Sequence, residues 1–128
     1  MAASITSQTL KSKNGINVIS IAWTTASDGT VAATETGYNI DGKVIAFVTN
    51  PGTAAPTAAY DPALANSDGA AIDGGALADR SATVSELVMP LIGTEVVEVP
   101  VLGPLTFSLA AGGDTKSGVI DIYFTRYN

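Results

Sequence analysis

Carboxylates and paired glycines gather in the middle of the chain, in the segment GAAIDGGALADR at 69–80 and just before it. Carboxylate oxygens bind Ca²⁺, and an EF-hand loop places them at alternating positions with a bidentate Glu at the twelfth. Counted from Asp68, the chain has too few oxygens at those offsets, which leaves a looser calcium site shared by Asp68, Asp73 and Asp79 as one alternative. The structural interpretation is that Asp68 shapes a turn and Asp73 caps a short helical turn. Asp79 then pairs with Arg80 or faces solvent.

Other catalytic chemistries lack their residues. The chain has no His and no Cys, which excludes Ser-His and Cys-His nucleophilic catalysis and zinc–sulfur sites. Glu95 and Glu98 are three positions apart on an expected strand and therefore point to opposite faces, unlike the paired acids of a glycosidase. The segment GGDTKSG at 112–118 lacks the glycine spacing of a phosphate-binding loop. We therefore predict a protein that is not an enzyme and needs no cofactor or metal.

Composition and charge describe a chain that can bury a core. Of its 128 residues, 46% are hydrophobic and 14% are charged, which fits one folded domain. The net charge of −6 argues against nucleic acid or an anionic membrane as a partner, because Lys11 and Lys13 are the only close basic pair. No apolar run reaches the roughly 18 residues that span a bilayer. The first residues carry no pattern of a secretory signal.

The chain is expected to divide into a short polar segment and one β domain. Residues 1–14, which include Lys11 and Lys13, have the composition of a flexible arm that orders on docking. Residues 15–128 are expected to form a single β-sandwich domain.

Alternation of apolar and polar residues predicts the strands. They are expected at 16–25, 31–36, 43–49, 85–92, 94–103, 105–113 and 118–127. Two of them have a clean apolar face, made of Ile19, Ile21 and Trp23 in the first and of Ile120, Ile122 and Phe124 in the last. The expected fold is all-β, an antiparallel β-sandwich or small barrel of jelly-roll or Ig-like type. It has about seven or eight strands and one short helical crossover within 71–86.

Turn residues punctuate these strands. The Asp-Gly turn at 27–30 is expected to lead into a short partner strand, and 112–118 to join the last two strands as a hairpin. Pro62 confines any strand around it to an edge, because proline cannot donate to a ladder.

Aromatic residues suggest packing or contact between subunits. Tyr123 and Tyr127 share one face of the last strand, which we interpret as a packing or subunit-contact face. Trp23 is either a core residue or, in a carbohydrate-binding module, part of an exposed platform for a sugar ring.

Two stretches, PTAAYDPALANSDGAAIDGGALADRSATVSE and VLGPLTFSLAAGGDTKSGVIDIYFTR, resemble a family of small virion proteins of tailed bacteriophages. The family pattern runs Pro-Thr-x-x-Tyr-Asp, then a Gly-Gly-Ala-x-Ala-[ND]-Arg segment, then Gly-Pro-Leu-Thr, an acidic glycine turn and Lys-x-Gly. The matching residues are Pro56, Thr57, Tyr60, Asp61, Gly69, Asp73, Gly74, Gly75, Ala76, Asp79 and Arg80, followed by Gly103, Pro104, Leu105, Thr106, Gly113, Asp114, Lys116 and Gly118. The resemblance covers roughly 16–127. The chain departs from the family pattern at Pro62, where the family has a β-branched residue.

The resemblance implies a structural role in the virion. Together with the low charge and small size, it leads us to expect a capsid decoration protein on the phage head surface, made in the host cytoplasm. Such a protein would bind the major capsid protein as a homotrimer. Alternatives are a tail-tube, neck or fibre-associated virion protein, or a carbohydrate-binding module. In this reading, 69–80 is a fixed connection that Arg80 pins by binding Asp73 or Asp61.

Overall fold

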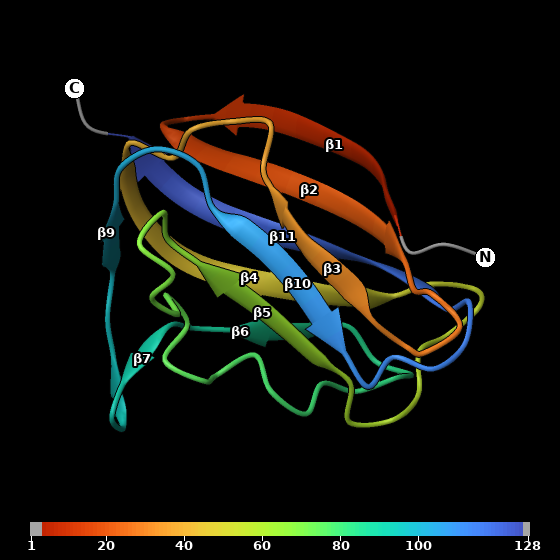
Figure 1. Cartoon of the computed structure of the whole chain (residues 1–128). Coiled ribbons are helices and arrows are strands. Elements are labelled where there is room, and N and C mark those ends of the chain that lie inside the picture. The colour runs from red at the N-terminus through yellow and green to blue at the C-terminus, as the bar shows by residue number, and fades with distance from the viewer. Residues whose placement is uncertain (1–3, 127–128) are drawn as a thin grey trace.

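Two antiparallel β-sheets pack face to face in the computed structural model, which describes residues 4–126 (Figure 1). The larger sheet has six strands in the order β1-β2-β11-β4-β6, with β9 also paired to β4. The smaller sheet has the order β3-β10-β5, and β7 and β8 form a separate pair. The strands are β1 (Ser4–Lys13), β2 (Ile16–Thr24), β3 (Val31–Glu35), β4 (Gly42–Pro51), β5 (Asp61–Ala65), β6 (Glu86–Val88), β7 (Leu91–Ile92), β8 (Glu95–Val96), β9 (Val99–Val101), β10 (Thr106–Ala110) and β11 (Ser117–Arg126). The predicted all-β sandwich is therefore confirmed.

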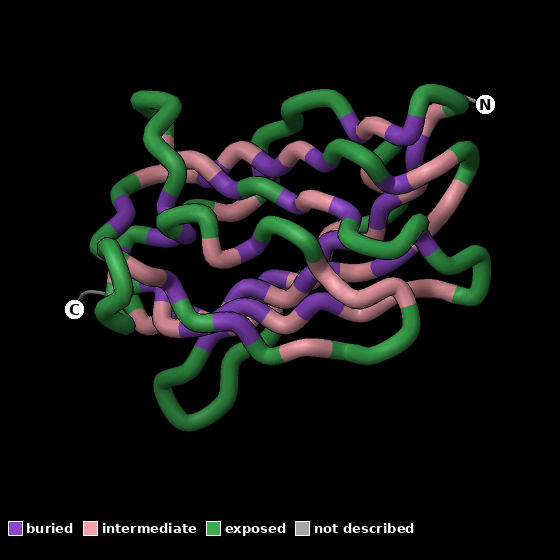
Figure 2. Tube along the Cα trace, turned by 90° about the horizontal axis from the view of Figure 1, so that it is seen from below, coloured by how far each residue is buried: buried purple, intermediate pink, exposed green. Residues whose placement is uncertain are grey.

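The core lies between the sheets and consists of the alternating residues that the sequence singled out. Buried positions follow one another at every second residue along β2 and β11, while the loops are exposed (Figure 2). Full burial of one such Ile or Phe side chain contributes about 1.5–3 kcal/mol. The buried side chains that meet across the interface include Ile19, Ile21, Trp23, Ile120, Ile122 and Phe124 from the larger sheet and Leu64, Phe107 and Leu109 from the smaller one.

The contact of Trp23 with Tyr60 joins the two layers. Tyr60 immediately precedes β5, and its ring centroid lies 5.7 Å from that of Trp23. Both side chains are almost fully buried. Burial raises the pKa of the Tyr60 hydroxyl above its ordinary value, because the phenolate would lose its hydration.

The strand count is higher than predicted, and the predicted helical crossover is wrong. Residues 86–101 break into four short strands, with Pro90 and Gly93 between them. No helix forms among residues 4–126. Gly74 and Gly75 have φ values of 65° and 87°, far from the −63° of an α-helix, so 73–77 forms a turn that cannot continue as a helix.

The expected flexible arm over 1–14 is also wrong for its described part, because residues 4–13 form β1. This strand pairs antiparallel with β2 along its whole length. Asn14 and Gly15 join the two strands with φ values of 53° and 82°, the positive values that a tight hairpin turn requires. Ile5 and Leu10 pack against the core. A bulge between Ile5 and Ser7 interrupts the alternation, so the spacing in the sequence does not show that Ile5 and Leu10 share the inner face.

The two glycine turns expected to close hairpins instead cross from one sheet to the other. β2 and β11 lie in the larger sheet, whereas β3 and β10 lie in the smaller one. The crossovers run beside each other, and the backbone N–H of Gly112 donates to the carbonyl of Gly29 at 2.9 Å. In the first crossover, the hydroxyl and the backbone N–H of Thr30 donate to Asp28, which lowers the pKa of the Asp28 carboxyl.

Thr25 fastens the two crossovers together. Its side chain is fully buried. The hydroxyl donates to the carbonyl of Gly113 at 2.6 Å and accepts from the backbone N–H of Lys116 at 2.8 Å. The prediction about Pro62 is confirmed, since among the strands within residues 4–126 β5 pairs with β10 alone and lies at the edge of its sheet.

Replacing Thr25 with Val should lower the free energy of unfolding by about 1–3 kcal/mol, because the N–H of Lys116 and the carbonyl of Gly113 lose their buried partner. Urea denaturation followed by Trp23 fluorescence measures the change. Thr24→Val is the matched control, because Thr24 is half-buried and is the last residue of β2, directly before Thr25. Equal stability of the two variants would contradict this role of Thr25.

Candidate functional site

The segment 69–80 is a structural connection built on Asp73. This side chain is only 4% exposed, and its Oδ2 accepts a hydrogen bond from the backbone N–H of Leu77 at 3.0 Å. Leu77 is fully buried. The sequence predicts that Asp73 caps a short helical turn; its side chain does bond to the backbone of this segment, but the segment is a turn and there is no helix for it to cap.

Asp61 holds the far end of the same segment. Its Oδ1 accepts a hydrogen bond from the backbone N–H of Asp79 at 2.8 Å. Asp79 has a φ of 58°, a left-handed conformation that aspartate tolerates better than most residues. Asp61 and Asp79 therefore both help to fix the backbone conformation of this loop.

Arg80 does not bind Asp73 or Asp61, and that prediction is wrong. Its Nη1 lies 3.7 Å from Oε1 of Glu86, and its Nε and Nη2 both donate to the carbonyl of Ala78. The backbone causes the difference, since Arg80 forms an antiparallel bridge with the residue before β5, and its side chain reaches β6.

The carboxylates do not assemble into a calcium site. Within residues 4–126, no three acidic side chains come together as potential metal ligands. The looser site shared by Asp68, Asp73 and Asp79 is therefore not formed.

Gly74 connects this loop to the β7–β8 hairpin. A Cβ atom at Gly74 would overlap with the carbonyl oxygen of Leu91, the first residue of β7. The backbone N–H of Leu91 also donates to the carbonyl of Asp73 at 3.1 Å. A Cβ atom at Gly75 would meet open space. The segment 69–80 thus sets the position of the hairpin through Gly74.

The hairpin belongs to a long exposed apolar segment, here called the apolar rim, that the sequence analysis missed. Its side chains are exposed to solvent, and Leu87, Ile92 and Leu102 are about 70% exposed. The sequence predicts strands over 85–92 and 94–103 and does not indicate that their apolar side chains are exposed. The signal in the sequence was the proline and glycine residues that interrupt these apolar runs. These residues shorten the strands, so the strands cover little of the core. The rim consists of Val84, Leu87, Met89, Ile92, Val96 and Leu102.

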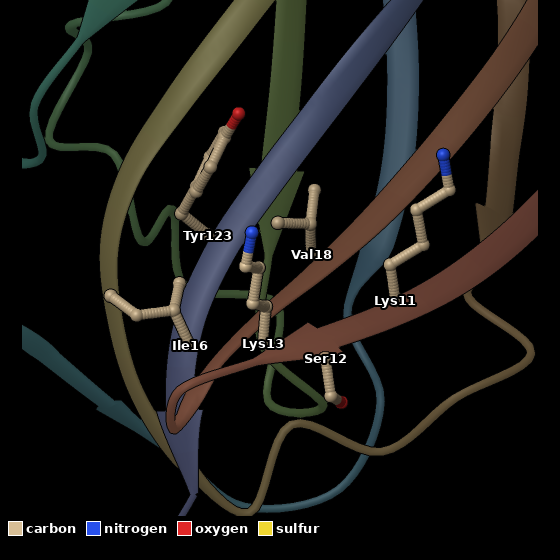
Figure 3. Close-up of a pocket in the computed structure, with 6 residues that line it drawn as sticks. All are labelled: Lys11, Ser12, Lys13, Ile16, Val18 and Tyr123. Atoms are coloured by element: carbon tan, nitrogen blue, oxygen red, sulfur yellow. The ribbon is translucent and has the colours of Figure 1, made fainter.

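A second surface gathers three of the four predicted interface residues. Lys11, Lys13 and Tyr123 line an open depression of about 610 Å³ on the outer face of the larger sheet, together with Ser12, Ile16 and Val18 (Figure 3). The pairing register explains the grouping, since Lys11 is opposite Val18 and Val18 is opposite Tyr123 across three adjacent strands. Tyr127 lies outside the described residues.

No family model matches the chain, and comparison with curated proteins and with solved structures found no significant match. Among residues 4–126 there is also no helix long and apolar enough to cross a membrane. The resemblance to phage virion proteins therefore remains a prediction from the sequence.

Trp23 offers no platform for a sugar ring. The side chain is 2% exposed and lies between the sheets against Tyr60. The carbohydrate-binding alternative depended on this residue and loses its best candidate.

Gly74→Ala should destabilise the fold by about 1–3 kcal/mol more than Gly75→Ala, because only the first substitution forces the loop away from Leu91. Both positions have positive φ, so the backbone strain of an alanine is common to the two variants. Thermal unfolding of both proteins measures the difference. Equal melting temperatures would show that the contact with Leu91 does not constrain the loop.

Fluorescence of the single tryptophan should be blue-shifted and resistant to acrylamide in the native protein, because Trp23 is shielded from water. Emission should move to longer wavelength on unfolding in urea. Red-shifted, easily quenched emission from the native state would place Trp23 at the surface and restore the sugar-binding alternative.

Proposed function

We propose that this chain is a non-enzymatic structural protein of a bacteriophage virion, a capsid decoration protein that binds the lattice of major capsid proteins. The observation that carries the proposal is the apolar rim. Six of the seven large apolar side chains that are exposed among residues 4–126 fall within 84–102, and such a concentration of exposed apolar side chains favours a contact surface. The resemblance in the sequence supplies the phage setting.

The mechanism is adhesive. A rigid sandwich that buries Val84 and Leu87 of the apolar rim against neighbouring capsid subunits binds the assembled shell in preference to free subunits. Binding of this kind stabilises the assembled state by mass action, in proportion to the logarithm of the ligand concentration over the dissociation constant. The chain acts on the head surface of the virion, after synthesis in the host cytoplasm, and associates with itself as a homotrimer.

The location of β1 changes which residues make the contact. Residues 4–13 are paired with β2, so they do not form a free arm that reaches a neighbour. We therefore assign capsid binding to Val84 and Leu87 of the apolar rim, which are 60% and 69% exposed. Truncating a hot-spot side chain of an interface costs about 2 kcal/mol or more, which is more than tenfold in affinity.

The double variant Val84→Ser/Leu87→Ser should bind heads at least about tenfold more weakly than the parent protein, because it loses two apolar anchors. Co-sedimentation with heads assembled from the major capsid protein of the phage that encodes this chain measures the binding. Ala33→Ser, an equally polar change at an exposed position of β3, is the control and should bind normally.

Two results would overturn the proposal. One is a parent protein that fails to co-sediment with heads, and the other is a double variant that binds as tightly as the parent. Binding to purified tails in place of heads would support the tail-tube or neck alternative.

A further inference from the structure

We infer that the β7–β8 hairpin of one copy of this chain docks into the Lys11/Lys13 depression of a second copy. The inference rests on the self-association contained in the proposed function and names the surfaces that make it. It joins the two exposed features that the sandwich itself does not use.

The hairpin is an apolar projection with one acid at its tip. Ile92 is 70% exposed and lies opposite Glu95 in the strand pairing, so these two side chains share one face of the hairpin, whereas Val96 lies on the other face with Leu91. The turn between β7 and β8 contains no large side chain. Glu95 is exposed and forms no ion pair with any residue between 4 and 126. Burial of the Ile92 side chain against a partner removes apolar surface from water, which is favourable.

The depression has the complementary chemistry. Ile16, Val18 and Tyr123 provide an apolar floor, and Lys11 and Lys13 extend from β1 beside it (Figure 3). Neither ammonium group lies within 4.0 Å of a carboxylate in the described part of the chain. A matching ligand is therefore apolar and carries a negative charge.

Complementarity between Glu95 and the lysine pair favours a second copy as the occupant. The chain carries 12 acids against 6 bases, so most pairs of surfaces on two copies repel each other. Arg80 and Lys43 are already close to Glu86 and Glu98 within the same copy. The lysine pair thus offers the Glu95 of another molecule an attractive contact, with Ile16 beneath it as an apolar neighbour.

The placement of the two surfaces makes the contact head-to-tail. The depression lies beside β1, which is one edge of the larger sheet, and the hairpin follows β6, which is the opposite edge (Figure 1). Different surfaces therefore meet in each contact. Contacts of this kind generate closed rings when the rotation closes, and a ring of three accounts for the proposed homotrimer.

Charge reversal tests the contact. Light scattering coupled to size-exclusion chromatography should give an oligomer for the parent protein. Glu95→Lys and the double variant Lys11→Glu/Lys13→Glu should each raise the apparent dissociation constant at least about tenfold, because like charges then face each other. Combining the three substitutions in one chain should recover the parent mass. Glu35→Lys, a reversal at an exposed position of the smaller sheet, is the control and should leave the mass unchanged.

Each other outcome overturns the inference. A monomeric parent at 100 μM, at roughly physiological salt, would show that the copies do not associate. Variants that keep the parent mass, or a combined variant that stays dissociated while its Trp23 emission remains native, would show that these residues do not pair. Failure here is distinguishable from failure of the proposed function, because head binding is measured separately with the Val84→Ser/Leu87→Ser protein. If the protein forms an oligomer but does not bind heads, the contact between copies stands and the decoration role fails.

Discussion

The packing of Trp23 against Tyr60 is the interaction on which the rest of the structure depends. It presses the larger sheet onto the start of β5 in the smaller one. Gly118 makes room for it, since a side chain there would collide with the indole ring. The backbone of Tyr60 pairs with Arg80, which anchors the end of the 69–80 segment.

That anchor extends to the surface. The 69–80 segment is closed by Asp73 and meets Leu91 through Gly74, so the core contact determines where the β7–β8 hairpin projects. The hairpin itself covers little of the core and remains exposed. A rigid base beneath an exposed apolar tip favours binding, because less conformational entropy is lost when the partner arrives.

Local patterns in the sequence predicted the structural features that depend on a few neighbouring residues. The alternation in β2 and β11 identified the core faces, Pro62 identified an edge strand, and the position of Asp73 before Leu77 indicated a side chain that bonds to the backbone of its own segment. These features depend on the period of a strand or the geometry of one turn.

Partners distant in the sequence were not predictable in the same way. An Asp-Gly turn has the same chemistry whether the next strand pairs with the previous one or crosses to the other sheet, so the 27–30 and 112–118 connections were misread. Arg80 lies near several acids in the sequence, and only the bridge to Tyr60 directs it to Glu86. The register of β1 places Lys11 opposite Val18, which in turn lies opposite Tyr123. No spacing within 1–14 shows this grouping.

In the proposed assembly, the contacts between copies and the contacts with the capsid use different residues. Val84 and Leu87 precede the hairpin, while Lys11 and Lys13 lie at the opposite sheet edge. A ring built through the hairpin would leave Val84 and Leu87 of each copy available to a lattice. Multiple weak contacts presented by one ring bind more tightly than one contact alone.

Electron cryomicroscopy of phage heads saturated with the purified protein tests the central claim most directly. The account predicts added density on the outer surface of the head, with the two-sheet sandwich resolved and Val84 and Leu87 of the apolar rim against the capsid subunits. Heads that show no added density, or sandwiches bound through the smaller sheet with the rim facing solvent, would contradict it.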